Sequence, residues 1–193
     1  MIKYILHGGE TGIPNKHNEG FYQEWVKDID NDKVPSILLV YFSRPDETWD
    51  ELEKSDKERF AKYTNNREAK FVVADSDMGV FKKQIEEADI IYFRGGKTQK
   101  IVDTISTIKD EFLSLIDGKV YAGSSAGVMF LSDYARSSDK GWKKWFGLLP
   151  INSIVHYSDE KHKETLEEFR NNNPDNQNEY ILLPETEFIV KRY

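Results

Sequence analysis

The stretch Gly123-Ser124-Ser125-Ala126-Gly127 contains the residues whose chemistry is easiest to interpret in this sequence. It follows the short apolar run at 119–122 and precedes an apolar helical start at 128–130. A serine on a sharp turn between a strand and a helix needs small neighbours, and such a turn aims backbone N–H groups at an oxyanion that develops during acyl transfer. Only Ser125 stands between both glycines, so the pattern predicts Ser125, and not Ser124, as a nucleophile.

A serine hydroxyl is a weak nucleophile until a base removes its proton, so this interpretation requires a histidine. His156 directly follows the apolar stretch 151–155, which predicts a position at a strand end, on the same sheet edge as Ser125. We therefore predict His156 as the general base. The alternative is a structural histidine that is only hydrogen-bonded in the core.

The other three histidines fit this role less well. His162 lies in the charged helical segment Lys161-His162-Lys163-Glu164, where we expect a solvated surface position. His17 lies in a polar loop. His7 precedes Gly8-Gly9, which fits either the oxyanion glycine motif of lipases or an ordinary histidine at a strand end.

Glycines follow three of the short apolar runs, at Gly8-Gly9, at Gly95-Gly96 and within 123–127. In open α/β sheets, ligands bind outside the carboxyl ends of the strands, where glycine lets the backbone approach a substrate. Strand-to-helix turns also favour glycine for purely local reasons. Three such sites together predict one active-site edge.

The elements that must position these residues follow the pattern of an α/β fold, in which short apolar runs alternate with longer amphipathic stretches. This pattern predicts a mainly parallel sheet with helices on both faces. The expected strands are residues 4–6, 36–42, 70–74, 89–93 and 119–122, followed by a final strand pair at 180–183 and 187–190. No linker or repeat interrupts the sequence, so residues 1–193 are expected to form a single domain.

Composition excludes several function classes. With 27 Lys+Arg against 34 Asp+Glu, the formal net charge of -7 repels phosphate backbones, and nucleic acid is not an expected partner. No stretch is long and apolar enough for a membrane span or a signal peptide, so a cytoplasmic protein is expected. The absence of cysteine excludes disulfides, thiolate zinc sites and a cysteine nucleophile. No metal-ligand spacing or phosphate-binding loop is visible, and no cofactor is expected.

Three motifs in this order resemble the serine peptidase family that includes peptidase E and cyanophycinase, and the resemblance runs over nearly the whole chain. They are Phe93-Arg94-Gly95-Gly96-Lys97-Thr98, the turn at 123–127, and Val155-His156-Tyr157 followed by 163–169. The resemblance implies a three-layer flavodoxin-like sandwich similar to class I glutamine amidotransferases. It also implies hydrolysis of short peptides, as by a dipeptidase, and a possible homodimer. Relatives tend to continue past Tyr193, so a compact or shortened variant is expected.

The resemblance also implies roles for individual residues. Ser125 would be the nucleophile and His156 the base, and the backbone at Gly96 and Ala126 would form the oxyanion hole. The third catalytic residue would lie in the loop after the serine helix, where Asp139 fits the spacing better than Asp133. That segment, 136–140, also has the composition of an ordinary polar surface loop, and Glu185 or Glu187 are the alternatives for orienting the histidine.

Two positions depart from the family pattern and bear on the substrate. Lys97 replaces the usual asparagine, and Leu166 stands where peptidase E carries the arginine thought to receive the substrate's aspartate. Leucine offers no donor to a carboxylate, so we predict an enzyme without strict specificity for aspartate. Alternatively, Leu166 is a core-facing helix residue, and Arg94, Lys97 or Arg170 supplies the charge.

Two other function classes remain open at this point. An α/β-hydrolase esterase shares the serine turn, but His156 follows Ser125 by so few residues that the usual intervening strands do not fit. A binding module could have kept the fold and lost turnover. Glutamine amidotransfer itself is excluded because that chemistry uses a cysteine.

Overall fold

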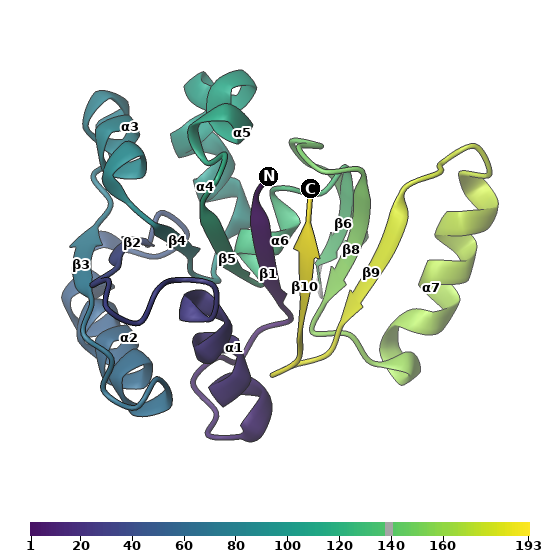
Figure 1. Cartoon of the computed structure of the whole chain (residues 1–193). Helices are drawn as coiled ribbons and strands as arrows, with labels where there is room; N and C mark the ends of the chain where they lie inside the picture. The colour runs from purple at the N-terminus through teal and green to yellow at the C-terminus, as the bar shows by residue number, and fades with distance from the viewer. Residues whose placement is uncertain (138–140) are drawn as a thin grey trace.

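The computed structural model describes residues 1–137 and 141–193 (Figure 1), and its larger sheet has six strands in the order β10-β1-β5-β4-β2-β3. The first five strands along the chain run parallel to their neighbours, whereas β10 is antiparallel to β1. The strands are β1 (Lys3–His7), β2 (Ser36–Val40), β3 (Lys70–Val73), β4 (Ile90–Phe93), β5 (Val120–Ser124) and β10 (Phe188–Arg192).

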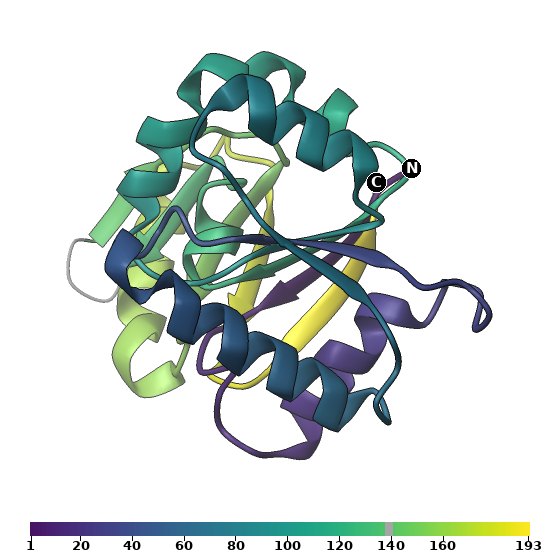
Figure 2. The same cartoon turned by 90° about the vertical axis from the view of Figure 1, so that its left-hand side faces the viewer.

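Helices cover both faces of this sheet, as Figures 1 and 2 show. In β2, Ile37 and Leu39 pack with the helices of one face, while Leu38 and Val40 pack with those of the other. Side chains alternate along a strand, so a strand covered on both faces must be apolar at every position. One face carries α1 (Lys16–Val26) and α2 (Trp49–Tyr63), with the short 3-10 helix η1 (Asp46–Thr48) before it. The other carries α3 (Met78–Glu87), α4 (Thr98–Ile105), η2 (Ser106–Glu111), α5 (Phe112–Leu115) and α6 (Ala126–Met129). The predicted mainly parallel α/β sandwich is confirmed.

A second sheet of four strands, in the order β7-β6-β8-β9, was not predicted. Its inner face joins the core that contains α3, α4 and α5, through Ile151, Val155 and Leu183 among others. Its outer face is covered by α7, whose Phe169 stacks on Trp142 with ring centroids 4.0 Å apart. The elements are β6 (Tyr134–Ser137), β7 (Gly141–Lys144), β8 (Ile151–Val155), α7 (Asp159–Asn172) and β9 (Glu179–Leu183).

One expectation and one alternative interpretation for this region were wrong. The last two strands do not pair with each other, because β9 pairs with β8 and β10 pairs with β1, so the chain crosses from one sheet to the other at 184–187. Arg136 is not in a polar loop but in β6, opposite Trp142 of β7. Among the described residues, each helix is too short or too polar to cross a membrane.

Candidate active site

Ser125 lies between β5 and α6 in a strained backbone conformation, with φ 49 and ψ -102. A non-glycine residue with such angles costs about 1–3 kcal/mol and persists only where the surroundings hold it. Here its N–H donates to the carbonyl of His7 at 2.9 Å. A Cβ at Gly123 would lie 2.7 Å from the Gly127 carbonyl oxygen, and one at Gly127 would lie 2.5 Å from that of Phe93. Because backbone atoms cannot move aside easily, the turn requires both glycines.

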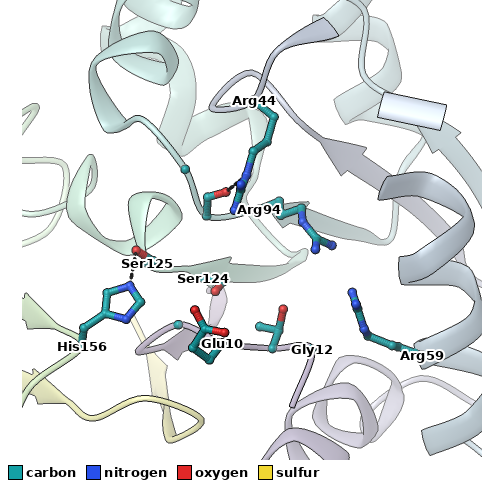
Figure 3. A pocket seen from close by; sticks show the side chains of 12 residues that line it. Glu10, Gly12, Arg44, Arg59, Arg94, Ser124, Ser125 and His156 are labelled. Atoms are coloured by element: carbon teal, nitrogen blue, oxygen red, sulfur yellow. Dashed lines mark hydrogen bonds between the residues drawn. The ribbon is translucent and has the colours of Figure 1, made fainter. Parts of the chain in front are cut away.

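A line of hydrogen bonds joins Ser125, His156 and Glu185. The Ser125 Oγ lies 3.1 Å from His156 Nε2 (Figure 3), and His156 Nδ1 lies 3.1 Å from Glu185 Oε1. A carboxylate accepts hydrogen bonds, so Nδ1 carries the proton and Nε2 is left to accept one from the serine. The serine comes from the larger sheet, the histidine follows β8, and the glutamate lies in the turn between β9 and β10.

Gly9 packs directly against the imidazole of His156. Gly9 has φ 129, and a Cβ built on it would lie 2.2 Å from His156 Cε1. The Gly9 backbone is held on both sides, since its N–H donates to His7 Nδ1 at 3.0 Å and its carbonyl accepts from the Thr186 N–H at 2.9 Å. The His156 N–H in turn donates to the Gly8 carbonyl at 3.0 Å. The position of the imidazole is therefore fixed by the loop after β1.

The turn at Gly95-Gly96 lies directly against the serine, because a Cβ on Gly95 would lie 3.1 Å from Ser125 Cβ. Within the described residues, the N–H groups of Gly96 and Ala126 have no hydrogen-bond acceptor. Two free backbone donors beside a serine can stabilise the oxygen of a carbonyl under attack.

His7 is fully buried behind this site. Its Nδ1 accepts from the Gly9 N–H, so its Nε2 carries the proton and donates to Asn18 Oδ1 at 2.7 Å. The Asn18 amide donates in turn to the carbonyls of Glu10 and Ile13. Burial lowers the pKa of His7 to about 4. Of the two interpretations of His7, this geometry fits the strand-end histidine, which here holds the loop after β1.

The four carboxylates considered for orienting the histidine lie in different places. Glu185 contacts His156, as described above. The Asp133 carboxylate accepts from Asn178 Nδ2 at 3.0 Å, so it is engaged elsewhere, and Glu187 is exposed ahead of β10. Asp139 lies outside the described residues.

The expectation that His162 is solvated was wrong, because its exposed fraction is 4%. Its ring stacks on Tyr157, and Nδ1 lies within hydrogen-bonding distance of the Ser158 backbone. His162, Leu166 and Phe169 form the buried face of α7 at helical spacing, which the lysines around His162 obscured.

The two residues predicted to bind substrate do not line the pocket at Ser125. Leu166 is buried within α7, which agrees with the alternative interpretation of a core-facing residue. Lys97 is exposed and lines a smaller neighbouring cavity with Ser43 and Pro45.

The pocket at Ser125 has a volume of about 390 Å³ and contains three arginines, of which the sequence analysis named only Arg94, as an alternative source of positive charge. Ser125 and His156 lie at one end, and Arg44, Arg59 and Arg94 lie at the other (Figure 3). The available signal was position, since Arg94 directly follows β4 and Arg44 follows β2 closely, at the edge where ligands bind. Within the parts of the chain that the structure describes, no three histidine or carboxylate side chains converge as a metal site would require.

Comparison with known proteins places the chain in a family. No curated protein sequence matches it. A peptidase from an acI-B1 Actinobacterium has the same fold, with 21% identity and a TM-score of 0.69 over 98% of this chain and 83% of the other. A protein from Listeria monocytogenes EGD-e that is described as a peptidase E also has this fold. It shares 15% identity, with a TM-score of 0.63 over 100% of this chain and 99% of the other. The model of Peptidase family S51 matches residues 5–192, so the chain belongs to that family and is a serine-type peptidase.

Proposed function

We propose that this peptidase hydrolyses short peptides with Ser125 as nucleophile, His156 as general base and Glu185 as the carboxylate that orients the histidine. The observation that carries the proposal is the hydrogen-bonded line from Ser125 Oγ through both imidazole nitrogens to Glu185 Oε1. No single motif in the sequence connects these three residues.

In this mechanism Ser125 Oγ attacks the carbonyl carbon of the scissile bond while His156 Nε2 takes the hydroxyl proton. The carbonyl oxygen becomes an oxyanion and accepts hydrogen bonds from the N–H groups of Gly96 and Ala126. His156 then donates the proton to the leaving amine, and the C–N bond breaks. Water, deprotonated by the same histidine, attacks the acyl-enzyme and releases the acid and Ser125.

Glu185 replaces Asp139 as our candidate for the third residue. The 3.1 Å contact with His156 Nδ1 supports this choice, and the hydrogen bond of Asp133 to Asn178 argues against Asp133. A carboxylate on Nδ1 holds the tautomer in which Nε2 accepts a proton, and it stabilises the imidazolium that forms.

The size of the site supports a short substrate. A volume of about 390 Å³ falls within the roughly 300–1,000 Å³ range of small-ligand sites. Ser125 comes from one sheet and His156 from the other, so we propose that residues 1–193 act as one domain.

The test is hydrolysis of a dipeptide library by the wild type and by single variants. Ser125→Ala and His156→Ala should each lower kcat on the order of a million-fold, because residues of such a unit act together. Two exposed residues outside the site supply matched controls, and Ser106→Ala and His17→Ala should keep wild-type rates. Hydrolysis that survives in Ser125→Ala, or a wild type that cleaves no peptide, would overturn the proposal.

A further inference from the structure

Three arginines from three different elements meet at the end of the pocket away from His156. Arg44 lies after β2, Arg94 lies after β4, and Arg59 belongs to α2 (Figure 3). The side chains of Arg94 and Arg59 are largely buried, with exposed fractions of 13% and 24%. We call these three residues the arginine wall.

Behind the wall lies Asp56, a fully buried carboxylate on α2. It accepts hydrogen bonds from Tyr41 Oη at 2.9 Å, from Arg59 Nη1 at 3.2 Å and from Arg94 Nη1. A buried carboxylate is stable only when it is paired and hydrogen-bonded, so Asp56 and the two guanidinium groups fix one another.

Charge balance shows that the wall does more than neutralise Asp56. Arg44 is not bonded to Asp56, since its Nε donates to the Gly95 carbonyl at 2.5 Å. Burial, together with repulsion from Arg94, lowers the pKa of Arg44. The pocket holds three guanidinium charges against Asp56 and the exposed Glu10, which leaves a positive surplus. A pocket whose charged side chains are largely buried and carry surplus positive charge favours an anion.

A peptide substrate offers this pocket a carboxylate, which guanidinium binds through paired, charge-assisted hydrogen bonds. We propose that Asp56 is a positioning residue that holds Arg94 and Arg59 so that, with Arg44, they bind a carboxylate of the substrate. The proposal rests on the function proposed above and names the peptides that the site selects. It replaces the expectation, drawn from Leu166, of an enzyme without strict specificity for aspartate, because the positive charge comes from elements other than α7.

The carboxylate can be an acidic side chain or the peptide's C-terminus, and four substrates separate the two sources. They are Asp-Leu, Ala-Leu and the C-terminal amides of both. In the wild type, removing the carboxylate that the wall binds should lower kcat/KM at least 100-fold, mainly through KM. A difference between Asp-Leu and Ala-Leu identifies the side chain, and a difference between free and amidated peptides identifies the C-terminus.

Variants then test the role of Asp56. Asp56→Asn should shrink the wild-type discrimination to less than tenfold, mainly through the KM of the peptide that carries the carboxylate. Asp56→Glu keeps the charge and should restore part of the discrimination. Arg59→Gln removes one guanidinium at a partly exposed position, and it should have the same effect even if Asp56→Asn does not fold. Asp89→Asn breaks a pair with Lys33 near the start of β4 and supplies the control, with unchanged discrimination.

Labelling of Ser125 by a fluorophosphonate, which carries no carboxylate, keeps this proposal separate from the proposed function. Equal kcat/KM for all four peptides in an enzyme that is labelled and active would overturn the role of the wall and leave the function standing. Unchanged discrimination in both Asp56→Asn and Arg59→Gln would also overturn it. A wild type that is neither labelled nor active would overturn the function itself.

Discussion

Replacing Gly9 by alanine tests how closely the loop after β1 holds the proposed base. The added Cβ would lie 2.2 Å from His156 Cε1, whereas ordinary contact begins at 3.4 Å, so the imidazole must move by about 1.2 Å. Gly9 cannot yield easily, because its N–H and carbonyl are both hydrogen-bonded. A shift of that size breaks the 3.1 Å contact between His156 Nε2 and Ser125 Oγ. Since a 1 Å misplacement costs on the order of 100-fold, kcat should fall at least about 100-fold.

The measurement is steady-state hydrolysis of the best dipeptide, with unfolding followed in parallel. Gly9 has φ 129, so alanine there also strains the backbone, which should cost about 1–3 kcal/mol of stability. Gly118→Ala is the matched control, because Gly118 has φ 74 but nothing within 4 Å of an added Cβ. It should lose stability and keep its kcat. A wild-type kcat in Gly9→Ala, or an equal loss in Gly118→Ala, would refute the reasoning.

Three further predictions concern the proposed triad and its support. Glu185→Gln should lower kcat by up to about 10,000-fold with the fold retained, while Glu187→Gln keeps the wild-type rate in the same kinetic assay. Asp139→Asn should hydrolyse dipeptides at the wild-type rate, and a loss comparable to that of Glu185→Gln would restore Asp139 as the third residue. Because burial lowers the pKa of His7 from 6.5 to about 4, the unfolded chain binds the proton more tightly. Neutral His7 therefore contributes to the stability of the folded protein in full above pH 6.5, and this stability is lost as pH falls towards 4. By pH 4 the free energy of unfolding should have dropped by about 3 kcal/mol relative to a His7→Gln variant, as measured in denaturant titrations.

Local patterns were sufficient for the elements buried on both faces. The four central strands of the larger sheet, β1, β5, β4 and β2, are short apolar runs, and such runs are visible without knowledge of their neighbours. The turn around Ser125 was equally visible, because its glycines are required by contacts within a few residues and with the adjacent strand.

The second sheet was missed because its strands carry weak local signals and pair with segments far away in the sequence. The strands β6 and β7 are polar on their exposed sides and short, so their composition is that of a loop. The pairing of β9 with β8 and of β10 with β1 depends on contacts far apart in sequence, and the turn between β9 and β10 looks locally like a hairpin.

Only those site residues that carry a local sequence signal could be predicted. Ser125 and His156 each directly follow an apolar strand, which is a local signal. Glu185 lies 29 residues after His156 in a Pro-Glu-Thr turn with no signature of its own. Sequence reasoning therefore left Glu185 as one of several alternatives. The arginine wall comes from three elements, and only the fold brings its members together.

Covalent labelling of Ser125 tests the central claim most directly. The wild type is treated with a fluorophosphonate, and the site of the adduct is located by mass spectrometry of its fragments. We expect one adduct on Ser125, absent in Ser125→Ala and greatly reduced in His156→Ala, because the serine hydroxyl needs a base to remove its proton. An adduct on another residue, or full peptidase activity without any adduct on Ser125, would contradict the account.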